Sequence, residues 1–256
     1  MIRQYLLFFG LLGLFFQCNQ TKKEAKKIDK IEQIFAENTY GFGTSVKLSI
    51  YSDSTYDFTI IDESSNHQKI EKFNGICFIK KDTIYFSPLE FEYTDSKKAI
   101  LNNNFIEFIA GKYPLKLKVK KSTITIKQTI DLGQLDAYSI FTFDKKFHNY
   151  FEEDVKPYQL TQKDIIELDK VLEKCFEDNK LNLSRKSNQY SKQIIAVINP
   201  KNNIEVCVNC NCKDSMFKDE FECQIIQVHD GGNCHFRLKI NLTKKNYSKL
   251  SINGLA

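Results

Sequence analysis

The sequence contains none of the short motifs that mark common catalytic sites. It has no G-x-S-x-G nucleophile elbow, no H-E-x-x-H metal-binding helix, no Walker phosphate loop and no G-x-G-x-x-G nucleotide fingerprint. Tryptophan is absent, and the histidines are confined to positions 67, 148, 229 and 235. These absences leave no positive case for an enzyme, so we predict no catalytic residues, no cofactor and no metal.

The chain also has only a small excess of positive over negative charge. The chain has 37 basic and 32 acidic residues, a formal net charge of +5, and the two signs are mixed along the sequence. A nucleic-acid-binding surface requires basic residues clustered on one face. We therefore expect no nucleic-acid partner.

Long apolar runs are limited to Tyr5–Phe16, shortly after Arg3. As a helix, this run would reach about 18 Å, whereas the hydrocarbon core of a bilayer is about 30 Å thick. The run is therefore too short to span a membrane, and its length is typical of the apolar region of an export signal. We predict that residues 1–17 are a signal peptide.

The segment Phe15-Phe16-Gln17-Cys18 resembles the lipobox of bacterial lipoproteins, with Phe15 and Gln17 standing where that family prefers leucine and a small residue. The resemblance implies that Cys18 receives acyl chains such as palmitate and anchors the protein to a membrane of the cell envelope. Asn19 is compatible with transfer to the outer membrane. Two or three acyl chains, at about 0.8 kcal/mol per buried methylene, anchor a protein stably. The alternatives are an ordinary secretory leader and an uncleaved anchor, with Cys18 incidental in both.

The cysteines beyond Cys18 gather near the end of the chain, five of them within residues 207–234. Export favours disulfides. On a regular strand, Cys210 and Cys212 share one face and Cys207 faces the other way, which disfavours a common zinc site. Cys234 is also expected to face the core, so we predict a Cys212–Cys234 bridge. Participation of Cys223, reduced core cysteines and zinc remain as alternatives.

Residues 38–147 alternate apolar and polar side chains, as in Val46, Leu48 and Ile50. The alternation predicts eight or nine short strands, and we expect an antiparallel meander, sandwich or open barrel. Residues 18–37 are charged and are predicted to be a tether. Residues 148–160, with the acidic run Glu152-Glu153-Asp154, are predicted to be a hydrated linker.

Residues 161–256 predict one helix followed by antiparallel strands. Thr161 and Asp164 have the spacing of a capping box, and the helix should extend to residue 180 with Cys175 on its apolar stripe. Strands are expected over residues 190–198, 204–212, 221–229 and 234–242, with a hairpin turn at Asp230–Asn233. The predicted fold class is thus α+β, mainly β, with the helix packed on a four- or five-stranded antiparallel sheet.

Three segments of this second domain are similar to a C-terminal domain of uncharacterised lipoproteins of Gram-negative bacteria. They are Val228-His229-Asp230-Gly231-Gly232-Asn233-Cys234-His235-Phe236, Ile240–Thr243 and Ile252-Asn253-Gly254. The order of helix and strands is also similar to a cystatin-like or nuclear-transport-factor-like roll. These resemblances imply a fold and no activity.

The candidate ligand contacts are Asp230, Gly231, Gly232, Asn233 and His235. Backbone N–H groups of an Asp-Gly-Gly-Asn turn could bind an anion, although hairpin geometry also explains this sequence. His235 shares a strand face with Arg237 and Lys239, which we expect to form a solvated basic stripe.

The leading hypothesis is a membrane-anchored lipoprotein that acts as a non-enzymatic binding or envelope-structural module, with a protein of the envelope as a possible partner. One alternative is a hydrolase-like enzyme with its site in the concave face of the C-terminal sheet. Another is an inhibitor or immunity-type partner protein. A concave pocket with two or more buried ionisable side chains would favour the enzyme. A cavity filled by Phe221, Ile225, Phe236 and Leu238 would favour the module.

Overall fold

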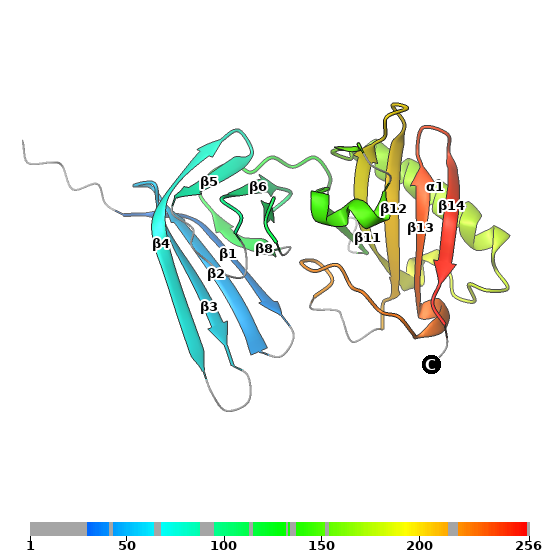
Figure 1. Cartoon of the computed structure of the whole chain (residues 1–256), viewed down its shortest axis with the longest axis horizontal. Coiled ribbons are helices and arrows are strands. Elements are labelled where there is room, and N and C mark those ends of the chain that lie inside the picture. Colours follow the sequence, from blue (N-terminus) through cyan, green and yellow to red (C-terminus); the bar gives the residue numbers. More distant parts are fainter. Residues whose placement is uncertain are drawn as a thin grey trace, which may run out of the picture.

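The computed structural model is mainly β, and the residues that it describes form two sheets that lie side by side and one α-helix (Figure 1). It describes residues 30–40, 43–63, 68–87, 95–112, 115–131, 133, 137–151, 154–214 and 220–254. The predicted signal peptide and the lipidation site Cys18 lie outside the described residues. So do His67, Glu152 and Glu153, and the side chain of His148.

The first sheet is a closed antiparallel barrel. Its strands are β1 (Glu32–Tyr40), β2 (Thr44–Tyr51), β3 (Thr55–Asp62), β4 (Lys69–Lys80), β5 (Thr83–Ser87), β6 (Lys98–Asn102), β7 (Phe105–Ile109) and β8 (Leu115–Ser122). β1 pairs with β2 on one side and with β8 on the other, where Ala36 lies opposite Val119. The predicted meander of consecutive antiparallel strands is present, but the sandwich and the open barrel are wrong because this last pairing closes the sheet.

Side chains fill the interior of the barrel. Val46, Leu48 and Ile50 point inward, as their alternation predicts. Aromatic rings pack at the centre, with Phe86 5.1 Å from Tyr56 and 5.3 Å from Phe108 between ring centroids. At about 1.5–3 kcal/mol for each large apolar side chain removed from water, this core stabilises the barrel.

The barrel begins earlier in the chain than the sequence predicts. β1 starts at Glu32, inside the segment 18–37 that we expect to be a tether. Ile34 and Ala36 are fully buried in the barrel core, whereas Glu37 lies on the outer face. Charged residues surround this short alternation and obscure it. A prediction from composition alone therefore places the first part of β1 in the tether.

The second sheet contains β9 (Tyr138–Phe141), β10 (Lys156–Pro157), β11 (Tyr190–Ile198), β12 (Ile204–Cys212), β13 (His235–Asn241) and β14 (Asn246–Ile252). β11 to β14 are antiparallel neighbours, and β11, β12 and β13 correspond to the strands predicted over residues 190–198, 204–212 and 234–242. β9, however, pairs in parallel with β11 and precedes the helix in the chain. The second sheet is therefore not the predicted cystatin-like roll of one helix followed by consecutive strands.

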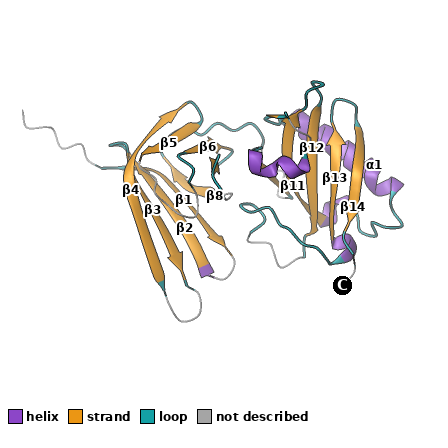
Figure 2. Cartoon of the chain, viewed as in Figure 1, coloured by secondary structure: helices purple, strands orange, loops and turns teal. Residues whose placement is uncertain are grey.

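The helix α1 (Gln162–Asp178) covers one face of this sheet (Figure 2). Thr161 accepts a hydrogen bond from the backbone N–H of Asp164, and the Asp164 carboxylate accepts one from the backbone N–H of Thr161, which completes the predicted capping box. Cys175 is fully buried in the core beneath the helix. The helix, its cap and the packing role of Cys175 are confirmed.

A second, smaller core covers the opposite face of the sheet. Phe147 of the short helix η3 (Lys145–Tyr150) and the following Phe151 pack there against Val197 of β11 and Cys207 of β12. The segment 220–228 lies over the same face without forming a strand. The predicted strand over 221–229 is therefore wrong, and β12 pairs directly with β13.

Polar contacts join the two sheets. The Glu107 carboxylate of β7 accepts the backbone N–H of Thr142, just beyond β9, at 2.9 Å. Lys118 Nζ of β8 lies 2.6 Å from Glu222 Oε2 of the segment 220–228. No helix in the described part of the chain has both the length and the apolar character needed to cross a membrane.

Candidate functional site

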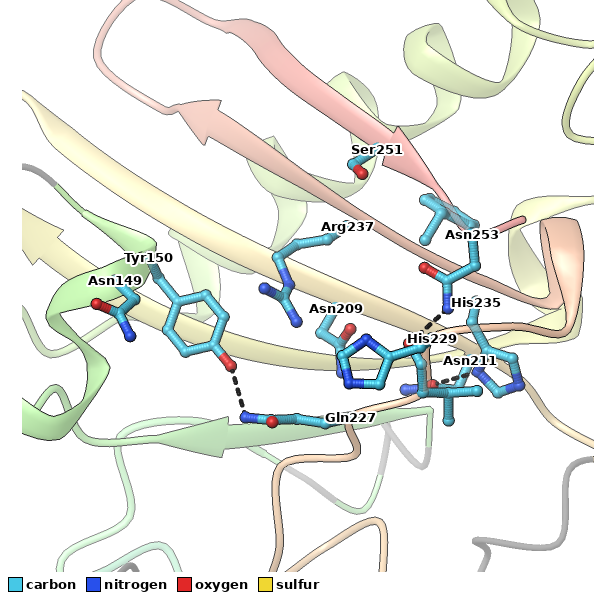
Figure 3. A pocket seen from close by; sticks show the side chains of 12 residues that line it. Asn149, Tyr150, Asn209, Asn211, Gln227, His229, His235, Arg237, Ser251 and Asn253 are labelled. Atoms are coloured by element: carbon cyan, nitrogen blue, oxygen red, sulfur yellow. Dashed lines mark hydrogen bonds between the residues drawn. The ribbon is translucent and has the colours of Figure 1, made fainter.

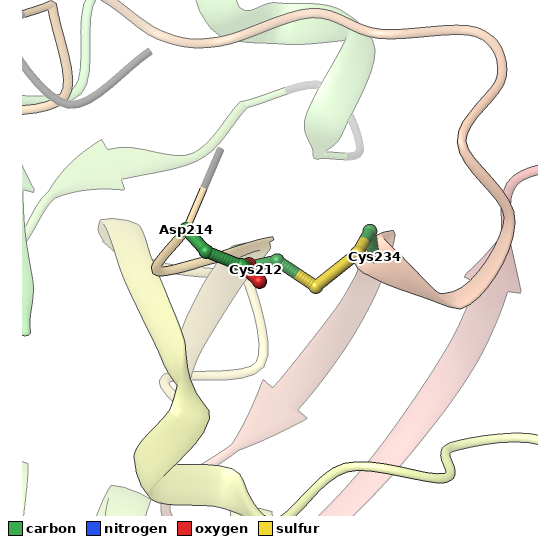
Figure 4. A group of neighbouring side chains, drawn as sticks. All are labelled: Cys212, Asp214 and Cys234. Atoms are coloured by element: carbon green, nitrogen blue, oxygen red, sulfur yellow. A yellow bond between two sulfur atoms is a disulfide. The ribbon is translucent and has the colours of Figure 1, made fainter. Parts of the chain in front are cut away.

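The predicted disulfide is present between Cys212 at the end of β12 and Cys234 just before β13 (Figure 4). The two Cα atoms are 4.9 Å apart. The loop that the bridge closes contains the segment 220–230, so the disulfide fastens both ends of that segment to the sheet. Cys77, Cys175, Cys207, Cys210 and Cys223 are buried free thiols.

Three side chains at this bridge have the spacing of metal ligands, but each already has a partner within the protein. The ligand atoms of Cys212, Asp214 and Cys234 lie within 4.8 Å of one another. The two sulfurs are bonded to each other, and the Asp214 carboxylate accepts two hydrogen bonds of 3.0 Å from Arg185. Cys210 faces the helix-side core and Cys207 the opposite core, as predicted. The cysteines therefore serve packing and cross-linking.

The segment Asp230–Asn233 is a turn, but no hairpin. Gly231 and Gly232 have φ angles of +81° and +56°, as expected for glycines in a tight turn, and lead into the short helix η5 (Gly232–Cys234). The Gly232 N–H donates to Gly254 O, and the Asn253 amide donates to Val228 O and Asp230 O. These hydrogen bonds fasten the turn, which contains four of the predicted ligand contacts, to the C-terminal segment 252–254.

The described residues do form a pocket of about 340 Å³ on the sheet face opposite α1 (Figure 3). Neighbouring residues of β12 and β13 form its floor, where Asn209 lies opposite Arg237 and Asn211 lies opposite His235. The sides come from η3, the segment 227–229 and the end of β14, through Asn149, Tyr150, Gln227, Val228, His229, Ser251 and Asn253. Of the predicted ligand contacts, only His235 lines this pocket.

A buried amide network holds the segment 220–228 above the sheet. The Gln193 side chain donates to Phe221 O at 2.8 Å and accepts the backbone N–H of Ile226 at 2.8 Å. Asn209 donates to Gln193 and to Ile226 O. These hydrogen bonds use the amide N–H groups of Asn209 within the protein, so this residue shapes the pocket.

His235 is held in place from two sides. Its Nδ1 lies 2.8 Å from Asn211 Oδ1. Its ring packs on Gly231, where an added Cβ would come within 2.7 Å of the ring. Burial lowers the pKa of His235, and the charge of Asp230 opposes this shift only in part. Burial therefore favours the neutral form of His235.

The basic stripe is covered, so the prediction of a solvated stripe is wrong. The Arg237 guanidinium lies over the ring of Tyr150, 4.4 Å from its centroid. Lys239 is 9% exposed, and its Nζ lies 3.6 Å from Glu205 Oε2. η3 and the segment 220–228 cover this face, and sequence alternation cannot reveal a cover that comes from distant parts of the chain.

Two polar atoms of the pocket have no hydrogen-bond partner in the described part of the chain. They are Nδ2 of Asn211 and Nε of Arg237, and both atoms are buried. Asn211 as a whole is 2% exposed. Buried donors in native proteins nearly always have an acceptor, and these two donors of the pocket remain available to one.

The described lining of the pocket is mainly polar and includes two histidines and one arginine. Its described lining residues include no carboxylate and no cysteine, and Ser251 forms no hydrogen bond with either histidine of the pocket. Three of the four apolar residues expected to fill a single cavity are divided between the two faces of the sheet. Phe236 and Leu238 lie in the helix-side core, and Ile225 packs on the smaller core opposite.

Sequence reasoning misses Tyr150, Gln227, Asn209 and Asn211 as site residues. The signal for the last two is present, because they alternate with Val208, Cys210 and Cys212 in the second half of β12. Tyr150 and Gln227 carry no such signal, because they reach the pocket from segments without regular strand pairing.

Comparisons of the chain with protein-family models, with curated proteins and with solved structures found no match.

Proposed function

We propose that this chain is a lipid-anchored protein of the bacterial cell envelope, in the outer membrane, that acts as a non-enzymatic binding module. The anchor is Cys18, and the binding site is the pocket between η3, β12, β13 and the segment 227–229. The observation that carries the binding role is the pair of buried donors, Asn211 Nδ2 and Arg237 Nε, which lack an acceptor among the described residues.

An unsatisfied buried donor costs about 1–3 kcal/mol. A fold that needed no ligand here would gain stability from an apolar side chain in either place. The neighbouring amides of Gln193 and Asn209 are well satisfied, so the region is not poorly packed in general. The cost at Asn211 and Arg237 therefore favours a role in recognition.

The anchor is supported by the order of Arg3, the apolar run and Cys18. The resemblance to bacterial lipoproteins supports the same compartment, and the Cys212–Cys234 disulfide suits an exported protein. The sheet, the disulfide and the turn at Gly231 give the pocket a rigid frame, which suits binding of a ligand or an envelope partner.

The anchor is tested by metabolic labelling with radioactive palmitate. The wild type and a Cys77→Ala variant, which changes a cysteine buried in the barrel, should both take up label. Cys18→Ala should take up none, and globomycin should block processing of the wild type. Unlabelled wild-type protein that is freely soluble in the cytosol and retains Met1 would contradict the proposal.

A further inference from the structure

We propose that the pocket binds a small organic acid through its carboxylate, with Arg237 and Asn211 as the two residues that recognise the charged group. This inference rests on the proposed binding role of the pocket and adds the chemical class of its ligand. Figure 3 shows the two side chains on the floor, with Arg237 nearer η3 and Asn211 nearer His235.

Two buried donors of the pocket remain for a ligand. The side-chain amides of Asn209 and Asn253 already donate hydrogen bonds, to backbone carbonyls or to Gln193. Gln227 donates to the Tyr150 hydroxyl at 3.2 Å. Asn211 Nδ2 and Arg237 Nε are both donors, and neither has a partner in the described ranges. The group that completes them must therefore be an acceptor.

The positive charge of Arg237 also favours an acidic ligand. A guanidinium is always protonated in proteins, and the Arg237 side chain forms no ion pair with a carboxylate of the described residues. The described lining of the pocket contains no acid that could balance it. Lys239, the next basic residue on the same face, does have such a partner in Glu205. A positive charge that is partly removed from water is stabilised by a neighbouring anion.

The floor of the pocket carries one fixed charge. His235 is held by Asn211 and lies against Gly231, in a half-buried position that disfavours its charged form. Arg237 then supplies the one permanent charge on the floor, which matches a monoanionic carboxylate better than a phosphate dianion. The planar fork of a guanidinium pairs well with a carboxylate.

The size and lining of the pocket favour a small organic molecule. A volume of about 340 Å³ lies at the lower end of the range for small-molecule pockets, roughly 300–1,000 Å³. The Tyr150 ring and Val228 offer apolar surface next to the donors. The ligand should therefore carry an organic body behind its carboxylate, of the size of an acylated amino acid or a sugar acid.

The test is calorimetric titration of the purified full chain with pairs of carboxylates and their neutral amides. The probes are N-acetylglycine against N-acetylglycinamide, benzoate against benzamide, and glucuronate against glucuronamide, with inorganic phosphate as a separate arm. We expect saturable binding of at least one carboxylate and at least about tenfold weaker binding of its amide, because charge-assisted hydrogen bonds are about twice as strong as neutral ones.

Arg237→Gln should weaken binding of that carboxylate at least about tenfold, and Asn211→Asp should do the same by placing a like charge beside it. Arg185→Gln is the matched control, since it removes the same charge from a surface pair with Asp214, and it should leave the affinity unchanged. Arg237→Lys keeps the charge without Nε, so partial retention of binding in this variant separates recognition from a folding defect.

The outcomes separate the two proposals. Equal affinity for a carboxylate and its amide, with loss in Asn211→Ala, would overturn the acid class and leave the binding role intact. Binding of phosphate alone would also overturn the organic acid. Affinity for a carboxylate that Arg237→Gln and Asn211→Asp leave unchanged would place the site elsewhere, and an absence of heat with every probe would overturn the inference.

Discussion

Lys116 of β8 reaches across the joint between the two sheets, and its Nζ donates to the backbone carbonyl of Ile140 in β9 at 2.7 Å. The ammonium group lies between two aromatic rings, 4.2 Å from the centroid of Phe105 in the barrel and 4.1 Å from that of Phe141 in the second sheet. Lys116 is 3% exposed. The buried Lys116 side chain therefore contributes to the joint between the barrel and the second sheet, together with the Glu107 and Lys118 contacts.

Replacement of Lys116 should loosen this joint. Lys116→Ala removes the hydrogen bond and leaves a cavity, so we expect the free energy of unfolding to fall by about 2–4 kcal/mol. Lys116→Met retains most of the packing and should lose about 1 kcal/mol, because burial already disfavours the charged amine and lowers its pKa. Urea denaturation measures both values.

The matched control for this joint is Lys120→Met, at an exposed position of the same strand, which should stay within about 0.5 kcal/mol of the wild type. If Lys116→Ala proved as stable as this control, Lys116 would have no structural role at the joint.

Gly231 should be intolerant of any side chain. Gly231→Ala places a methyl group in a backbone with φ of +81° and within 2.7 Å of the His235 ring. We expect a loss of about 2 kcal/mol and a displaced histidine. Gly254→Ala, whose added Cβ would meet nothing within 4 Å, should change stability little. Thermal unfolding of the two variants gives the comparison, and equal melting temperatures would show that the turn is not a rigid support.

The disulfide predicts a definite alkylation pattern. In the unfolded, unreduced protein, alkylation should modify the five free thiols Cys77, Cys175, Cys207, Cys210 and Cys223. Prior reduction should add two further sites, Cys212 and Cys234, which intact mass detects. Reduction should also lower stability by about 2–4 kcal/mol. Modification of Cys212 and Cys234 without a reductant would remove the bridge from the account.

The buried thiol of Cys77 should make the barrel sensitive to alkaline pH. Burial, with a smaller contribution from the charge of Asp53, raises the pKa of Cys77 from 9.0 to about 11. Below pH 9 the thiol is protonated in both folded and unfolded chains. Between pH 9 and 11 the unfolded chain releases this proton first, so stability falls by up to about 1.4 kcal/mol per pH unit.

A Cys77→Ala variant lacks this contribution to the slope. Its free energy of unfolding should be lower than that of the wild type below pH 9, because of the lost packing, and the gap should narrow toward pH 11. Denaturant titrations in oxygen-free buffer measure the two curves. Parallel curves over this range would show that Cys77 titrates alike in folded and unfolded chains.

Local patterns predict the parts of this fold that depend on local physics. The capping box at Thr161 and the stripe containing Cys175 fix α1, since both act within a few residues. Strand alternation likewise places Cys207 and Cys210 on opposite faces and brings Cys212 and Cys234 together.

Contacts between distant segments could not be predicted from the sequence. Closure of the barrel depends on Ala36 meeting Val119, and no local signal encodes that pairing. The alternation over 221–229 suggests a strand, but the buried Gln193 takes up backbone groups of this segment instead. The same cover converts Arg237 from a surface residue into part of a pocket, so the candidate site is visible only in the folded chain.

Nitrogen-15 NMR of the arginine side chains tests the account most directly. Beyond the predicted signal peptide, the chain has only Arg185 and Arg237, so the Nε–H spectrum should contain one signal from each. On titration with the carboxylate probes, the account predicts that the Arg237 signal shifts and becomes protected from exchange while the Arg185 signal stays in place. An Arg237 signal that ignores every carboxylate, or that moves equally with the neutral amides, would contradict it.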